Sequence, residues 1–146
     1  MISQTYPFVE YRDAKGCVIH EPAPYLPVRI TNPHSGKALT TIALVDTGAD
    51  ACVFPADLAA MLEHNFQAAG VYSTDVVGVS GPGTVYKHTF NFEILMPNQQ
   101  DVLVSFDHVL VNCIDQEISP LLGVCDCLCR FKVTVDFPRQ TTMISM

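Results

Sequence analysis

The sequence predicts an all-β domain with one or two short helices, and three observations favour this class. Short apolar runs are separated by turn-forming residues, with 8 Gly and 10 Pro in 146 residues. Two segments alternate apolar and polar side chains, whereas only one short segment has the apolar spacing of a helix. The chain is also 49% hydrophobic, which is enough apolar material for one core and argues against disorder.

The first half of the chain begins with a segment of little periodicity. Residues 1–24 contain three prolines, so we expect an extended N-terminal arm. Residues 26–31 and 38–45 are rich in strand-forming side chains and flank a turn at 32–36. We therefore expect a hairpin whose second strand runs directly into Asp46.

A short helix is expected after this hairpin. Pro55 suits the first helical position, and Leu58, Met61 and Leu62 follow with the i, i+3, i+4 spacing of a buried stripe. We expect this helix to end near His64 and its three apolar side chains to enter the core.

The second half of the chain is predicted to consist of strands. Residues 71–79 and 85–94 are expected to form a hairpin around a turn at Gly81-Pro82-Gly83, and 85–94 has a period of two over nine residues. Its Tyr86 is therefore expected to pack as a core-facing aromatic side chain. Two short strands are expected at 102–104 and 109–111.

A last alternating strand is predicted at 131–137, after a compact segment that we expect to include a short helix. At this length one domain is expected. We divide the chain into an extended N-terminal arm (1–24), one domain (25–138) and a C-terminal tail (139–146).

The charge balance restricts the partners. There are 8 Lys and Arg against 15 Asp and Glu, a net charge of −7, so no basic surface is available for nucleic acid or an anionic membrane. The first residues lack the features of a secretion signal, and no run approaches the ~20 apolar residues of a membrane span. We expect a soluble, cytoplasmic protein.

The six cysteines are expected to be free thiols, since no secretion signal precedes them. Three of them form a Cys-x-Cys-x-Cys pattern at 125–129, which lacks the usual zinc-ligand spacing and a second ligand pair nearby. The five histidines show no zinc-protease pattern. We expect no metal and no cofactor, and metal binding at 125–129 remains an alternative hypothesis.

One stretch has the residue types of a catalytic site. Residues 43–50, Ala-Leu-Val-Asp-Thr-Gly-Ala-Asp, place a carboxylate at the end of an apolar strand. There Asp46 can reach a cleft, Thr47 offers a short hydroxyl that can fix the loop, and Gly48 lets a backbone N–H approach the carboxylate. A turn or cap aspartate is the simpler reading of the same residues.

The surroundings of this stretch favour the catalytic reading. An apolar-apolar-Gly segment lies at 121–123, and a glycine-rich segment lies between the two at 78–83. A phosphate-binding loop is excluded there because a strand, not a helix, follows it. A serine-hydrolase elbow is excluded as well, because Pro82 replaces the final glycine that Ser80 would need.

These motifs resemble the retropepsin-like aspartic proteases, the single-domain relatives of pepsin that include the retroviral proteases. The resemblance covers about residues 25–137 and is carried by 44–50, 79–84 and 121–123. It implies an acid-protease barrel with a flap hairpin and an aspartic endopeptidase activity that needs no cofactor. It further implies that Asp46 is catalytic and that Thr47 and Gly48 support it. The residues expected to contact substrate are Ala49, Asp50, Val79, Ser80, Gly81, Pro82 and Gly83.

One position departs from the family pattern. The retroviral enzymes usually have an arginine after the last glycine, paired with the acidic residue at the Asp50 position, but Val124 stands here. Asp50 then needs another partner, for which Arg130, Arg29 and Arg12 are candidates, or it is solvated.

The mechanism that the resemblance implies uses two aspartates on one water molecule, but this chain has one Asp-Thr-Gly. We therefore expect a homodimer in which the Asp46 residues of two subunits meet on a two-fold axis, acting on a peptide or protein substrate. The arm and the end after Phe137 are candidates for the interface. The alternative is a non-catalytic dimerisation or peptide-binding module with the same fold.

Overall fold

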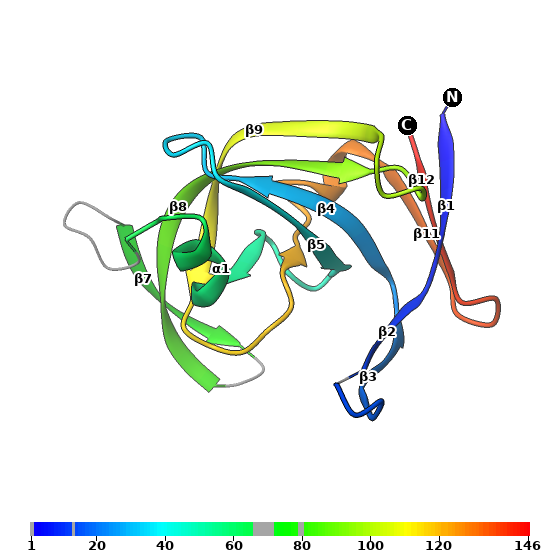
Figure 1. The fold of residues 1–146 in the computed structure, drawn as a ribbon, viewed down its shortest axis with the longest axis horizontal. Coiled ribbons are helices and arrows are strands. Elements are labelled where there is room, and N and C mark those ends of the chain that lie inside the picture. Colours follow the sequence, from blue (N-terminus) through cyan, green and yellow to red (C-terminus); the bar gives the residue numbers. More distant parts are fainter. Residues whose placement is uncertain (1, 13, 66–71, 79–80) are drawn as a thin grey trace.

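The computed structural model describes residues 2–12, 14–65, 72–78 and 81–146. Its main feature is a sheet with the strand order β4-β5-β10-β6-β9-β8-β7, which closes into a six-stranded barrel because β4 also pairs with β8 (Figure 1). The strands of this sheet are β4 (Tyr25–Thr31), β5 (Ala38–Val45), β6 (Val53–Pro55), β7 (Tyr72–Gly78), β8 (Gly81–Leu95), β9 (Val102–Ile114) and β10 (Leu121–Leu122). The predicted all-β class is confirmed.

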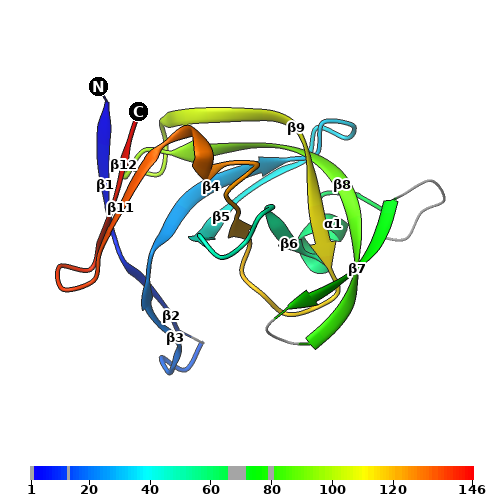
Figure 2. The ribbon, with the colours of Figure 1, turned by 180° about the vertical axis from the view of Figure 1, so that it is seen from behind.

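Two smaller sheets are built from the ends of the chain. The strands of these sheets are β1 (Ser3–Pro7), β2 (Val9–Arg12), β3 (Val18–Ala23), β11 (Lys132–Asp136) and β12 (Thr141–Ser145). β12 lies between β1 and β11, so the two termini lie side by side, while β2 and β3 form a separate hairpin (Figures 1 and 2). Tyr6 of β1 is buried, and its hydroxyl donates to the carbonyl of Leu95 at 2.7 Å. The division into arm, domain and tail stays a prediction, but the two end segments pair with each other.

The core lies inside the barrel and is rich in aromatic side chains. From His88 onward β8 alternates as predicted, with His88, Phe90, Phe92 and Ile94 buried and the residues between them partly exposed. At the start of this stretch the prediction that Tyr86 faces the core is wrong, because Tyr86 is only partly buried and its neighbour Val85 is buried. Phe54 of β6 packs against the rings of Phe90 and Phe92 with centroid distances of 5.2 and 6.1 Å. Burial of these large rings provides much of the apolar stabilisation of the barrel.

The predicted helix is present as α1 (Ala56–Met61), with Pro55 just before it, and a 3-10 turn, η1 (Leu128–Arg130), follows β10. Leu58 and Leu62 are buried, but the prediction that Met61 enters the core is wrong, since its side chain is 68% exposed. Leu58 and Leu62 are four residues apart and occupy the core-facing side, so Met61 lies beside the stripe at the helix end. Within the described part of the chain, no helix is long and apolar enough to cross a bilayer.

One turn prediction and one prediction of strand bounds are wrong. Gly81, Pro82 and Gly83 lie inside β8, paired with residues 76–78 of β7, and do not form the turn themselves. The two short strands expected at 102–104 and 109–111 are one strand, β9, because the pairing with β8 continues across an irregularity in register. A β-bulge lets a strand continue through a polar interruption that breaks the sequence pattern.

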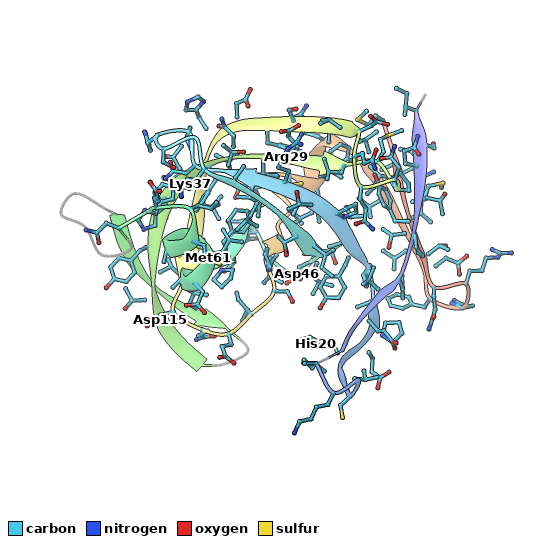
Figure 3. All side chains as sticks on the ribbon, in the orientation of Figure 1. His20, Arg29, Lys37, Asp46, Met61 and Asp115 are labelled. Carbon is cyan, nitrogen blue, oxygen red and sulfur yellow. The ribbon has the colours of Figure 1, made fainter. Side chains whose placement is uncertain are left out.

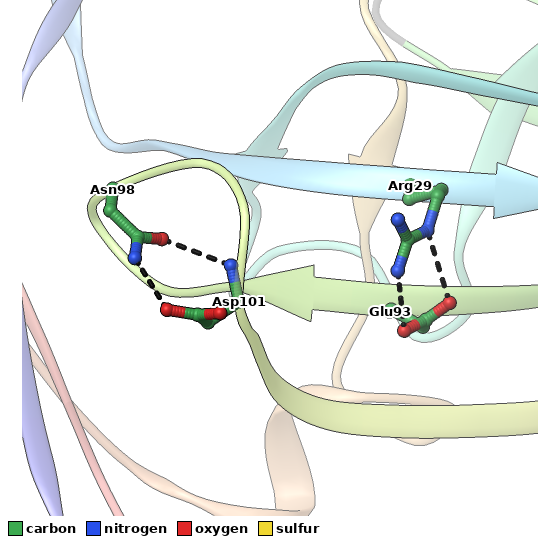
Figure 4. A network of polar contacts seen from close by, with 4 residues as sticks. All are labelled: Arg29, Glu93, Asn98 and Asp101. Atoms are coloured by element: carbon green, nitrogen blue, oxygen red, sulfur yellow. Dashed lines mark hydrogen bonds and ion pairs between the residues drawn. The ribbon is translucent and has the colours of Figure 1, made fainter.

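An ion pair joins β4 and β8, the two strands whose pairing closes the barrel. Arg29 on β4 donates from Nε and Nη2 to the two carboxylate oxygens of Glu93 on β8, at 3.2 and 3.1 Å (Figure 4). The hydrogen bonding and the charge of Glu93 raise the pKa of Arg29 above its ordinary value. The adjoining turn between β8 and β9 is fixed by Asn98, which donates to the carboxylate of Asp101 and accepts from its N–H.

Candidate active site

Asp46 lies where β5 leaves the sheet, and both neighbours of the strand hold it there. β10 runs parallel to β5, and the N–H of Asp46 donates to the carbonyl of Leu122 at 3.1 Å. On the other side, the N–H of Val45 donates to the carbonyl of Pro24 at 2.9 Å. The backbone that carries the carboxylate is therefore fixed up to and including Asp46, which lies near the centre of the view in Figure 3.

The loop after Asp46 turns back on the carboxylate. The N–H of Gly48 donates to Oδ1 of Asp46 at 2.9 Å, and the N–H of Ala49 donates to the Asp46 carbonyl at 3.2 Å. A Cβ on residue 48 would lie 3.3 Å from Oδ1, so glycine gives the carboxylate this close approach. Asp46 is half-buried, while Thr47 and Gly48 are exposed. One carboxylate oxygen is thus positioned, and the other has no partner among the described residues.

The turn that follows β10 holds this loop in place through backbone hydrogen bonds. The N–H groups of Val124 and Cys125 donate to the carbonyls of Ala49 and Asp50 at 2.8 and 2.7 Å. Gly123 lies so close that a Cβ there would overlap the backbone of Ala51. The predicted 121–123 segment is thus in direct contact with the predicted catalytic loop, and its glycine is required by space.

A partly buried carboxylate, that of Asp126, makes a second contact that holds the loop. Oδ2 of Asp126 accepts from the N–H of Cys52 at 2.9 Å, and the Cys52 thiol accepts from the N–H of Gly123 at 3.4 Å. Desolvation of the buried Cys52 raises the pKa of its thiol to about 12, so it stays neutral. Sequence reasoning missed Asp126, because an aspartate between two cysteines gives no indication that it points back to the catalytic loop.

Asp50 has no ion pair within the part of the chain that the structure describes, and its side chain is exposed. Of the candidate partners, Arg29 is paired with Glu93. Arg130 donates to the carbonyl of Ser105 and lies 4.6 Å over the ring of Phe106. The side chain of Arg12 lies outside the described residues. Backbone hydrogen bonds and Asp126 therefore hold the loop where the retroviral pattern has an arginine.

The residues expected to contact substrate fall into two groups. Ala49 and Asp50 lie in the same loop as Asp46. Gly81–Gly83 are strand residues of the β7–β8 hairpin, whose last described pair is Gly78 and Gly81, and Val79 and Ser80 lie outside the described residues. That this hairpin closes over Asp46 stays a prediction.

The cysteines do not form a thiol cluster that could hold a metal. Cys127 is buried in the core, whereas Cys125 and Cys129 are exposed, so the Cys-x-Cys-x-Cys segment sends its thiols in different directions. Burial raises the pKa of the Cys127 thiol above its usual range. Among the described residues, no group of three or more His, Cys, Asp or Glu side chains is placed to bind a metal ion.

A groove of about 820 Å³ lies beside this loop. Leu44 and Leu121 are part of its wall, two residues before Asp46 and two before Gly123. Sequence reasoning did not identify the groove, because its walls come from segments far apart in the chain. The only available signal was Met61, whose place in the apolar stripe was assigned to the core.

Comparison with known proteins identifies the fold. The structure is similar to a retropepsin-like aspartic protease from Rickettsia conorii, with a TM-score of 0.56 and 15% identity over 98% of this chain and 92% of that one. The protease of EIAV, in complex with the inhibitor HBY-793, matches with a TM-score of 0.47 and 20% identity over 70% of this chain and 83% of that one. The Rickettsia match shows that the chain has the retropepsin-like fold, as the sequence motifs predicted.

The sequence comparisons give less. No family model matches the chain. An 82-residue stretch, 55% of the chain, is 35% identical to part of the replicase large subunit of Tobamovirus Ob. The match spans 5% of the length of that subunit, so it carries no information on the function of this chain.

Proposed function

We propose that this chain is an aspartic endopeptidase that acts as a homodimer, with Asp46 of each subunit contributing one carboxylate to a shared site. The observation that carries the proposal is the Asp46 loop itself. On a retropepsin-like fold, Asp46 leaves the sheet with one oxygen bound to Gly48 N–H and the other without an intramolecular partner among the described residues. A carboxylate oriented in this way is suited to binding a water molecule.

The second carboxylate comes from another copy of the chain. Peptide hydrolysis by carboxylates needs one ionised group to accept a proton and one protonated group to donate a hydrogen bond. The chain has one Asp-Thr-Gly, so a two-fold axis beside Asp46 supplies the missing group. Thr47 and Gly48 are exposed in the single chain, which suits a loop that faces a partner.

The reaction then proceeds without a covalent enzyme intermediate. The ionised carboxylate takes a proton from the water as the water oxygen attacks the peptide carbonyl carbon. The protonated carboxyl donates its hydrogen bond to the carbonyl oxygen, where negative charge develops. The tetrahedral intermediate collapses when the C–N bond breaks and the amine leaves with a proton, giving a carboxylic acid and an amine.

The substrate is proposed to be an extended peptide segment. The β7–β8 hairpin provides strand backbone at Gly81, Pro82 and Gly83, and an extended peptide can add to such backbone by strand-like hydrogen bonds. Contacts with Ala49, Asp50, Val79 and Ser80 belong to this proposal. A reducing compartment such as the cytoplasm suits the six free cysteines.

The test is peptide cleavage by the Asp46→Asn variant, assayed between about pH 3 and 7, the range in which a carboxylate pair is half-protonated. We expect turnover to fall by at least about a thousandfold, with an unchanged melting temperature and molecular mass. Asp107→Asn is the matched control, since it removes an exposed carboxylate of β9 that has no part in the proposed site, and we expect it to retain turnover. Unchanged cleavage by Asp46→Asn refutes the assignment, and dimerisation without turnover by the wild type favours the non-catalytic module.

A further inference from the structure

The groove beside the Asp46 loop is a feature of the surface that the proposed chemistry does not use. Its volume is about 820 Å³, and its walls come mainly from β5, α1, β3 and the segment 117–121, with Tyr25 of β4 and Pro55 of β6. Asp46 itself is not part of the wall. Because Leu44 and Leu121 line the groove and Asp46 does not, the groove begins beside the candidate active site and extends away from Asp46.

The length of the groove can be read along β5. Leu44 lies two residues before Asp46 and Leu39 lies seven residues before it, and both line the groove. At ~3.3 Å per strand residue, the wall runs from about 7 Å to about 23 Å from Asp46. This interval is long enough for about five residues of an extended peptide.

The wall of the groove is mainly apolar. The side chains that make it so are Leu39, Leu44, Leu58, Met61, Ile118 and Leu121. Met61 is 68% exposed. Leu58 of the same wall is buried and the other four are partly buried. A large apolar side chain that remains exposed in a groove, as Met61 does, is typical of a binding surface.

The charged residues of the wall are of one sign. Asp57 of α1 and Glu117 of the segment 117–121 line the groove, and both are exposed. No lysine or arginine is part of the wall as far as the structure describes it, and His20 of β3 is its one titratable nitrogen base. Carboxylates from two separate elements therefore favour a cation in the groove.

We propose that this groove binds a segment of the substrate several residues away from the scissile bond, and that the segment combines a large apolar side chain with a lysine or arginine. The apolar side chain packs against Met61 and its neighbours, and the cation lies between Asp57 and Glu117. This inference rests on the proposed function, because the groove gains its role from its position beside Asp46. It assigns α1 and the segment 117–121 to substrate selection at a distance from the reaction.

Binding by the Asp46→Asn chain tests the inference without requiring turnover. Two fluorescein-labelled libraries of eight-residue peptides serve as probes, matched in leucine and methionine, one containing lysine and arginine and the other aspartate and glutamate. We expect the cationic library to bind about tenfold more tightly by fluorescence anisotropy, as two screened ion pairs allow. Adding Asp57→Asn with Glu117→Gln should reduce this preference to within about twofold.

The matched control replaces two carboxylates elsewhere on the surface, Asp101→Asn with Asp107→Asn, and should retain the preference in full. A second variant, Met61→Gln, should weaken the binding of both libraries alike, since it removes apolar contact but no charge. Equal binding of the two libraries, or an equal loss of preference in the groove and control variants, overturns the inference. Wild-type turnover is measured separately. Binding of the cationic library without turnover refutes only the proposed protease activity. Turnover without a preference for the cationic library refutes only the proposed role of the groove.

Discussion

Two corners of the barrel are held together by different chemistry. The Asp46 corner, residues 46–52 with the turn 121–127, is joined mainly by backbone N–H groups and carbonyls, which do not titrate. The histidine corner, formed by His34, His64 and His88, packs three imidazoles in a row, with ring centroids 6.3 and 4.7 Å apart. The comparison shows that backbone hydrogen bonds hold the candidate catalytic loop at any pH. The stability of the histidine corner, in contrast, depends on whether its imidazoles are protonated.

His64 is the residue through which the stability of the histidine corner depends on pH. Its Nε2 donates to the carbonyl of Thr89 at 2.9 Å, and its ring lies 4.6 Å from that of Phe90. Burial, and then the neighbouring His88, lower the pKa of His64. The neutral imidazole is therefore the form that this packing selects.

The largest expected loss of stability comes from a substitution in the Asp46 corner. Gly123→Ala places a Cβ on the backbone of Ala51, which has no flexible side chain that could move aside. We expect a loss of about 3 kcal/mol or more in the free energy of unfolding, measured by urea denaturation. Gly48→Ala, whose Cβ would meet only an oxygen of Asp46 at 3.3 Å, is the matched comparison and should cost less stability. An equal cost for both variants contradicts the tight contact at Gly123.

An intermediate effect is expected from the side-chain brace of the same corner. Asp126→Ala leaves the N–H of Cys52 without its acceptor and should cost about 1–3 kcal/mol. It should also lower turnover, because Cys52 ends the loop that carries Asp46. Asp107→Ala, at an exposed position of β9, should stay within about 0.5 kcal/mol of the wild type. A loss of stability no larger than that of the control shows that Asp126 does not brace the loop.

The smallest expected effect is a pH dependence of the free energy of unfolding that comes from the histidine corner. Because the pKa of His64 is lower in the folded protein than in the unfolded chain, the unfolded chain binds more protons just below pH 6.5. The free energy of unfolding therefore falls as the pH drops through about 6.5. His64→Gln keeps a donor for Thr89 and should flatten this fall, whereas His108→Asn, at an exposed position, should not. Denaturation midpoints across this range that are identical for wild type and His64→Gln exclude the histidine corner as the source.

The sequence predicted what depends on local pattern. β5 has the expected bounds, β8 buries its expected face from His88 onward, and the fold indicated by 44–50 and 121–123 is confirmed. The alternation of β8 and the apolar run that ends in Asp-Thr-Gly each contain this information within a short stretch of chain.

The sequence could not predict what depends on distant segments meeting. Asp126 reaches Cys52 across 74 positions of the chain, and the groove is formed by segments that lie far apart in the sequence. Met61 satisfied the helical spacing, but so short a helix presents only part of its apolar stripe to the core. The strand β12 has little alternation in sequence, and it exists because β1 and β11 pair with it on both sides.

The measurement that tests the shared site most directly is the activity of mixed subunits. Wild-type chain and Asp46→Asn chain are combined in equal amounts under conditions in which subunits exchange, and the mixture is compared with the same total amount of wild type. If each site needs Asp46 from both subunits, only dimers of two wild-type chains are active, and turnover falls to about a quarter. Turnover at about half of the wild-type value means that each chain acts alone and contradicts the account.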